Sequence, residues 1–124
     1  MAYVLLIEPD KLLADVCSQF LVSAGHKVIW RQTAEQGINA LDEQKINIVI
    51  LEIQLAVHNG IEFLYEMRSY SEWLDIPVIA HTHASRIPEF DNALKQLNVI
   101  KWLYKPQTSL ELLAKTVDVT LKNI

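Results

Sequence analysis

The stretch that decides the fold is Ile48-Val-Ile-Leu-Glu52-Ile-Gln-Leu-Ala-Val-His-Asn-Gly60. Four large aliphatic residues end at one carboxylate, Glu52, and Asn59-Gly60 then marks the start of a helix. This order is typical of a buried parallel strand that carries a charged group to the edge of a sheet. The functional question is therefore what the carboxylate of Glu52 does there.

Length and composition favour one compact domain over residues 1–124. The chain has 124 residues, and 51% of them are hydrophobic, which is enough for a sizeable core. Its single cysteine, Cys17, cannot form an internal disulfide and lies among apolar residues, so we interpret it as part of the packing.

Charge and hydropathy exclude two classes of partner. The net charge of -4 offers no basic surface for nucleic acid, so we expect no direct DNA or RNA contact. No apolar run approaches the roughly 18 residues that span a bilayer, and the N-terminus has no basic leader. We therefore expect a cytoplasmic protein without a membrane segment.

On both sides of this stretch the chain alternates between short apolar runs and segments with helical periodicity. Each helical segment begins near a capping residue: Asp10, Thr33, Asn59, Ser85 with Pro88 in the first turn, and a capping box of Thr108 and Glu111. The predicted strands are Tyr3–Ile7, Lys27–Trp30, Ile46–Glu52, Ile76–Ala80 running on into His81-Thr82-His83, and Val99–Tyr104.

Five strands that alternate with five helices predict an α/β fold with right-handed crossovers and helices on both faces. The arrangement we expect is the flavodoxin-like (βα)5 doubly wound parallel sheet with strand order 2-1-3-4-5. In such sheets ligands gather at the carboxyl ends of the strands.

Polar residues follow four of these strands. Glu8 and Asp10 follow the first, Glu52 the third, Thr82 the fourth and Lys105 the fifth. Carboxylates beside a lysine and a hydroxyl suit a divalent cation or a phosphoryl group. The alternative is that each residue only caps a strand or a helix, which explains Asp10 by itself.

In this order the residues Leu5-Leu-Ile-Glu-Pro-Asp10, Val49-Ile-Leu-Glu52, Pro77-Val-Ile with Thr82, and Lys105-Pro106 resemble the receiver domain of bacterial two-component response regulators. The resemblance covers essentially the whole chain. In that family, acidic residues after the first strand and an aspartate ending the third hold Mg²⁺, and that aspartate accepts a phosphoryl group from a histidine kinase. The resemblance further implies that Thr82 and Lys105, the latter before a cis proline, contact the phosphoryl group, and that Trp102 is a rotamer switch.

Two departures from the family pattern weaken this chemistry. Glu52 stands where the phosphoaccepting aspartate is expected, and Pro9 replaces the second acidic residue, leaving Glu8 and Glu52 as metal ligands with Asp10 displaced by one residue. Proline has no carboxylate, Mg²⁺ demands octahedral oxygen geometry, and the extra methylene of Glu52 moves its carboxylate by about 1.5 Å.

We therefore interpret the chain as an atypical receiver, or pseudo-receiver, that is not an enzyme and needs no cofactor. Glu52 either imitates the phosphorylated state by pairing with Lys105 or only fills the pocket. A buried carboxylate needs a partner, and Lys105 is the obvious one.

Three histidines suggest a second possibility. His81 and His83 flank Thr82 and would share a face of the strand, and with His58 or Glu52 they suggest a transition-metal site. The alternative is steric: an imidazole at residue 83 crowds the pocket.

The expected partners are a histidine kinase, a phosphotransfer protein or an output protein, bound through the fourth helix, fifth strand and last helix, with a homodimer as a further option. Trp102, Tyr104, Leu112 and Val119 are candidate anchors on that face. Two alternative functions remain open. One is a working phosphoaccepting receiver with Glu52 or Asp10 as acceptor, and the other is a flavodoxin-type flavin binder, which Glu8-Pro9-Asp10 disfavours by repelling phosphate.

Overall fold

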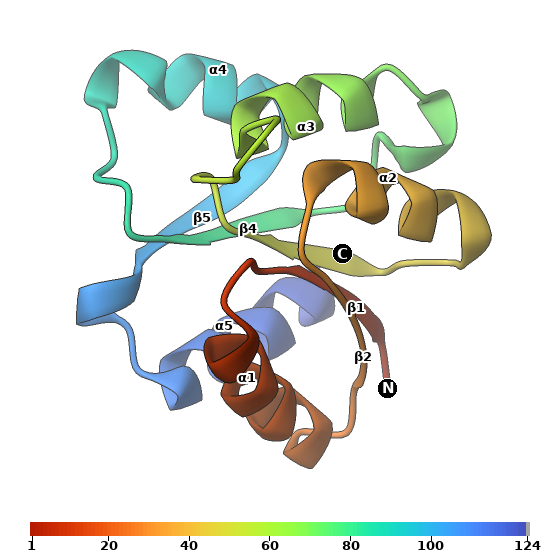
Figure 1. Ribbon diagram of the computed structural model, residues 1–124, viewed down its shortest axis with the longest axis vertical. Helices are drawn as coiled ribbons and strands as arrows, with labels where there is room; N and C mark the ends of the chain where they lie inside the picture. The colour runs from red at the N-terminus through yellow and green to blue at the C-terminus, as the bar shows by residue number, and fades with distance from the viewer. Residues whose placement is uncertain (124) are drawn as a thin grey trace.

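Five parallel strands form one sheet in the computed structural model of the protein, which describes residues 1–123 (Figure 1). Ile124, the last residue of the domain predicted over residues 1–124, lies outside the described residues. The strand order is β2-β1-β3-β4-β5, as predicted. The elements in chain order are β1 (Tyr3–Ile7), α1 (Lys11–Ser23), β2 (Lys27–Arg31), α2 (Ala34–Glu43), β3 (Ile48–Leu51), α3 (Gly60–Arg68), η1 (Ser71–Trp73), β4 (Val78–Thr82), η2 (Pro88–Phe90), α4 (Asp91–Gln96), β5 (Val99–Tyr104), η3 (Lys105–Gln107) and α5 (Leu110–Lys122).

The helices form two layers around the sheet. Helices α1 and α5 cover one face, and α2, α3 and α4 cover the other (Figure 1). Successive side chains of the central strands point to opposite faces, so each strand contributes to both cores. The core below α1 and α5 includes Val4, Leu6, Ile48, Ile50 and Ile79, and the core below α2 to α4 includes Leu5, Ile7, Val49, Leu51 and Ala80.

Local signals at the helix ends explain where α1 and α3 begin and end. Asp10 caps α1, since its Oδ1 accepts hydrogen bonds from the backbone N–H groups of Leu12 and Leu13 at 3.0 and 3.3 Å. Gly25 follows this helix with a φ of 94°, a conformation that favours glycine. Asn59 and Glu62 form a complete capping box at the start of α3.

Two predicted helix starts are wrong. The fourth helix does not begin at Ser85, because Ile87 precedes Pro88 and is extended, with φ -105° and ψ 111°. Instead Pro88 starts a short 3-10 turn, and α4 begins at Asp91. The last helix is capped by Ser109, whose side chain accepts from the Leu112 N–H, whereas Thr108 donates its hydroxyl to the Tyr104 carbonyl at 2.7 Å.

Strand boundaries also differ by one or two residues from those predicted. Strand β3 is shorter than the predicted Ile46–Glu52, and β4 begins two residues later than Ile76 and extends to Thr82. Strand β5 has the predicted bounds. Its register with β4 shifts between Val78 and Ile79, which leaves Ile100 unpaired and 41% exposed.

No helix within residues 1–123 is long and apolar enough to cross a membrane.

Candidate functional site

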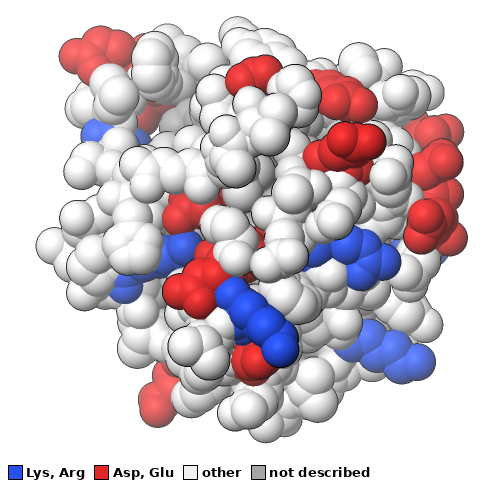
Figure 2. All heavy atoms as spheres, viewed as in Figure 1, with Lys and Arg blue, Asp and Glu red and all other residues white. Residues whose placement is uncertain are grey.

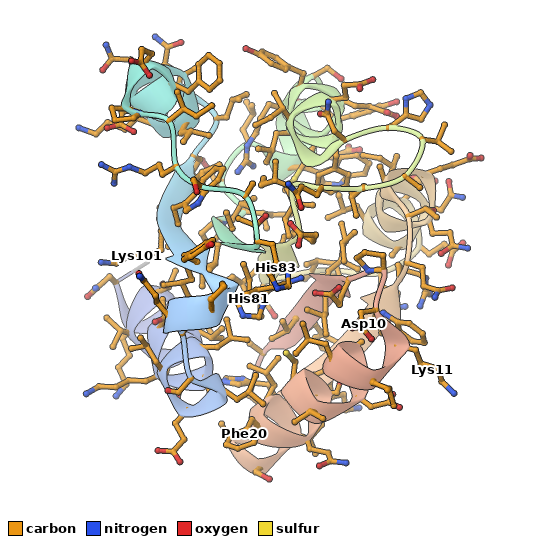
Figure 3. All side chains as sticks on the ribbon, turned by 60° about the vertical axis from the view of Figure 1, so that its left-hand side comes forward. Asp10, Lys11, Phe20, His81, His83 and Lys101 are labelled. Carbon is orange, nitrogen blue, oxygen red and sulfur yellow. The ribbon has the colours of Figure 1, made fainter. Side chains whose placement is uncertain are left out.

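The polar residues predicted to meet at the carboxyl edge of the sheet are brought together there. Glu8 and Glu52 directly follow the adjacent strands β1 and β3, and Lys105 follows β5 at the edge of the sheet. Figure 3 shows Asp10, His81 and His83 along this same edge. The three side chains of Glu8, Glu52 and Lys105 are 2%, 4% and 7% exposed, so they form a buried ionic cluster.

Lys105 binds both carboxylates. Its Nζ donates to Glu52 Oε1 at 2.7 Å and lies 2.6 Å from Glu8 Oε1. The predicted pairing of Glu52 with Lys105 is confirmed. The contact with Glu8 was not predicted, although the sequence placed two carboxylates and a lysine at the same edge of the sheet.

The remaining carboxylate oxygens are held by the backbone. Glu8 Oε2 accepts from the Asp10 N–H, and Glu52 Oε2 accepts from the Gln54 N–H, each at 3.0 Å. Glu52 Oε1 also accepts from the His83 N–H at 3.4 Å. Each oxygen of the two carboxylates therefore has a partner, as buried charges require.

These contacts shift the pKa values of the pair in opposite directions. Burial opposes the charged form of Glu52, but hydrogen bonds from Lys105, Thr82 and the Gln54 N–H outweigh it and hold the pKa of this carboxyl below its usual value. Burial likewise disfavours the charged form of Lys105, but hydrogen bonds to Glu52 and Glu8 raise its pKa above the usual value. Both groups are therefore charged at neutral pH.

Two further predicted positions connect the pocket to β5. Thr82 is fully buried, and its Oγ1 accepts from the Ala84 N–H at 3.0 Å. Trp102 is half-buried, and its Nε1–H donates to the Ala84 carbonyl at 3.1 Å. The loop after β4 is therefore tied both to the pocket and to the indole of Trp102.

The histidines do not assemble a metal centre. His58 pairs with Glu62 on α3 at 3.2 Å, and the Nδ1 of His83 is 4.0 Å from Glu52 Oε1 with its side chain 61% exposed at the mouth of the pocket. Among residues 1–123, no group of three or more His, Cys, Asp or Glu side chains is arranged to hold a metal ion.

His81 is buried, and the sequence analysis did not predict this burial. It is 2% exposed, and its Nδ1 has no hydrogen-bond partner. Burial, with the nearby charge of Lys105 adding to it, lowers the pKa of His81 to about 4, so its imidazole is neutral. His81 lies two residues after Ile79 on β4, and side chains two residues apart on a strand point to the same face. This spacing indicated that His81 faces the core below α1 and α5.

Comparison with protein families shows to which family the chain belongs. The family model described as the response regulator receiver domain matches residues 4–117. The chain belongs to this family.

Two transcriptional regulatory proteins resemble the chain in sequence. The transcriptional regulatory protein CpxR of Escherichia coli K12 is 30% identical over 116 residues, which are 93% of this chain and 47% of CpxR. The transcriptional regulatory protein GlrR of the same strain is 27% identical over 105 residues, covering 85% of this chain and 23% of GlrR. The chain thus spans less than half the length of these curated relatives.

Solved structures show the same fold. The chemotaxis protein CheY4 of Vibrio cholerae superposes with a TM-score of 0.86 at 24% identity, covering 96% of this chain and 98% of CheY4. A CheY-like receiver domain protein from Methanospirillum hungatei gives a TM-score of 0.88 at 19% identity, covering 99% of this chain and 95% of that one. These likenesses show the fold, and the match of residues 4–117 to the family model shows that the chain is a response regulator receiver domain.

The donor set of this receiver domain does not fit the Mg²⁺ that the family resemblance implies. Glu8 and Glu52 direct their carboxylates into the pocket, and both already bind the ammonium of Lys105. Pro9 offers no donor, and Asp10 uses its carboxylate to cap α1. A cation with octahedral oxygen coordination would have to displace the ammonium of Lys105 from both carboxylates.

One feature implied by the family resemblance is absent from the described residues. No peptide bond within residues 1–123 is cis, so the expectation of a cis proline at Pro106 is wrong. Residues Lys105–Gln107 instead form the 3-10 turn η3, which places Pro106 in its first turn.

Proposed function

We propose that this receiver domain works in a two-component pathway through protein–protein contacts, without taking up a phosphoryl group in the usual way. The observation that carries the proposal is the bridge of Lys105 between Glu8 and Glu52 at 2.6 and 2.7 Å. In the family pattern these positions hold the metal ligands, the acceptor and the lysine that contacts the phosphoryl group. Here the side chains at these positions bind one another.

The chemistry of the pocket supports this reading. A nucleophilic carboxylate needs a free oxygen aligned with the phosphorus atom. Both oxygens of Glu52 accept hydrogen bonds, and the carboxylate is 4% exposed. Its longer side chain also carries the carboxylate beyond the place where an aspartate would present it, so Glu52 acts as a fixed charge.

We infer further that Glu52 holds the domain in one signalling state. The carboxylate engages Lys105, as a phosphoryl oxygen would, and accepts from the His83 N–H. The next residue, Ala84, bonds to Thr82 and to Trp102, so the same loop links the pocket to the surface of β5. A permanent charge at Glu52 would then keep Trp102 in one orientation without a phosphorylation cycle.

The proposed partner surface is the one formed by α4, β5 and α5. Ile100, Leu112 and Val119 are 41%, 43% and 48% exposed there, so their apolar side chains are available to a partner. Trp102 and Tyr104 are half-buried and add less contact area than the sequence suggests. A histidine kinase, a phosphotransfer protein, an output protein or a second copy of the domain are the partners proposed for this face.

Intact-mass measurement after incubation with acetyl phosphate and Mg²⁺ tests the proposal. We expect the unmodified mass, while a receiver domain with aspartate at the acceptor position, treated in parallel, gains one phosphoryl group. A stoichiometric adduct that disappears in the Glu52→Gln variant would establish Glu52 as a working acceptor. An adduct that persists in this variant and disappears in Asp10→Asn would assign the acceptor role to Asp10. Either adduct would overturn the proposal.

A further inference from the structure

A groove between α2 and α3 lies outside the receiver pocket. Its main hollow has a volume of about 390 Å³, and a smaller hollow of about 130 Å³ continues it toward the loop after β3. The two hollows share Ala34, Glu35 and His58. The residues that line this α2–α3 groove are Thr33, Ala34, Glu35, Ile38, Asn39, Leu55, Ala56, Val57, His58, Glu62, Phe63 and Glu66.

The floor of the α2–α3 groove is apolar. Ala34 and Phe63 are buried at its base, and the side chain of Ile38 is half-buried. Leu55 and Val57 extend the apolar surface along the loop, and Val57 is 85% exposed, the most exposed large hydrophobic residue within positions 2–123. Val57 and Leu55 thus continue the apolar floor of the groove onto the surface, where a partner can cover both the hollow and the loop.

The rim of the groove is acidic. Glu35 on α2 and Glu62 and Glu66 on α3 are exposed, and the two glutamates on α3 are one helical turn apart, where like charges repel. His58 pairs with Glu62, whereas no salt bridge within residues 1–123 involves Glu35 or Glu66. The carboxylates of Glu35 and Glu66 are therefore available to a cationic ligand, while Glu62, which also accepts from the Asn59 N–H, adds its negative charge to the rim.

Other residues of α2 and α3 add to the negative charge around the groove. Helix α2 also carries Asp42 and Glu43, and the one basic residue of the two helices, Arg68, turns inward and donates to the carbonyls of Leu97, Trp73 and Ile76. These helices hold five of the 15 acidic residues and one of the 11 Lys and Arg, which leaves ten acidic and ten basic residues in the rest of the chain. The net negative charge thus originates on this face, and Figure 2 shows carboxylates gathered over α2 and α3.

We propose that the α2–α3 groove is a docking site for a basic amphipathic segment of a partner protein. Lysine or arginine side chains of the segment pair with Glu35 and Glu66, close to the charge of Glu62, and its apolar side chains cover Ile38 and Val57. The charge selects this occupant, because a second copy of the same acidic face would be repelled. The inference goes beyond the proposed function, since it names a different surface and does not depend on whether Glu52 accepts a phosphoryl group.

Amide chemical shifts of ¹⁵N-labelled protein, titrated with a synthetic helical peptide of leucine and lysine, test the docking site. A leucine–glutamate peptide of the same pattern is the matched control ligand. We expect shifts confined to residues 33–39 and 55–66 with the basic peptide and none with the acidic one. Shifts spread over other elements, no shifts at all, or equal binding of the acidic peptide would each overturn the proposal.

Two triple variants separate the groove from general charge. We expect E35Q/E62Q/E66Q to weaken binding of the basic peptide by about tenfold or more, because the rim loses its three negative charges. The variant D15N/E89Q/E111Q removes the same net charge at exposed positions elsewhere and should bind like the parent protein. Equal weakening in both variants would show non-specific attraction and overturn the groove. The mass measurement with acetyl phosphate is independent of these variants.

Discussion

The ammonium of Lys105 and the carboxylate of Glu8 are 2.6 Å apart, although they follow strands at the edge and near the centre of the sheet. Lys105 reaches across the ends of β4 and β3 to make this contact, and it binds Glu52 on the way. The three buried charges form a unit in which the lysine compensates both carboxylates, and its integrity is measurable.

Replacing Lys105 by methionine should destabilise the domain strongly. The substitution leaves two buried carboxylates without their counter-charge, and loss of one partner of a buried ionic cluster costs about 3–5 kcal/mol. Urea unfolding of Lys105→Met against the parent measures this cost. Lys101→Met removes an exposed cation on β5 and should change the free energy of unfolding by about 0.5 kcal/mol or less. A loss of similar size in both variants would mean that the bridge contributes nothing.

The free energy of unfolding should fall in acid because Glu52 becomes protonated. Its pKa is lowered on folding from a usual value of 4.5, so its contribution is fully present above that pH and is lost as the pH falls through the folded value. Unfolding free energies measured from pH 7 to pH 3 should therefore decline below about pH 4.5. In Glu52→Gln that part of the decline should be missing, and an unchanged slope would contradict the assignment.

Replacing His81 by leucine should stabilise the domain. The imidazole is buried with an unpartnered Nδ1, and an apolar side chain of similar size avoids a desolvation cost of about 1–3 kcal/mol. The pH dependence should change as well. Because the pKa of His81 falls from 6.5 to about 4 on folding, the unfolded chain takes up the proton first, and the parent loses stability as the pH falls from 6.5 to 4. His81→Leu should lack this loss; His83→Leu, at the exposed mouth of the pocket, is the matched control.

Trp102→Phe should loosen the loop after β4. The ring is retained, but the hydrogen bond from Nε1 to the Ala84 carbonyl is lost, at a cost of about 1 kcal/mol. Hydrogen exchange of residues 83–87 should become faster. Trp30→Phe is the matched control, because its Nε1 bonds to the Glu8 carbonyl and its loss should leave these amides unchanged. Equal protection of the loop in Trp102→Phe and the parent would remove the link between pocket and β5.

The order of strands and the residues at their ends were predictable from the sequence. Continuous apolar runs such as Tyr3–Ile7 identify strands buried on both faces, and a chain that alternates such runs with amphipathic helices has few compact solutions. The fold then places Glu8, Glu52, Thr82 and Lys105 at one edge. Local signals within a few residues, such as Asn59 and Glu62, were likewise sufficient for the start of α3.

Only the tertiary structure decided the contacts between segments that are far apart in the chain. Lys105 and Glu52 are 53 residues apart, and no local pattern says that one ammonium binds both Glu52 and Glu8. The orphaned nitrogen of His81 and the meeting of the acidic faces of α2 and α3 have the same origin, since packing sets them after every helix is in place. The sequence by itself determined the sheet and the residues at its edge; side-chain packing decided that Lys105 binds both Glu8 and Glu52, because burial leaves a charge no other partner.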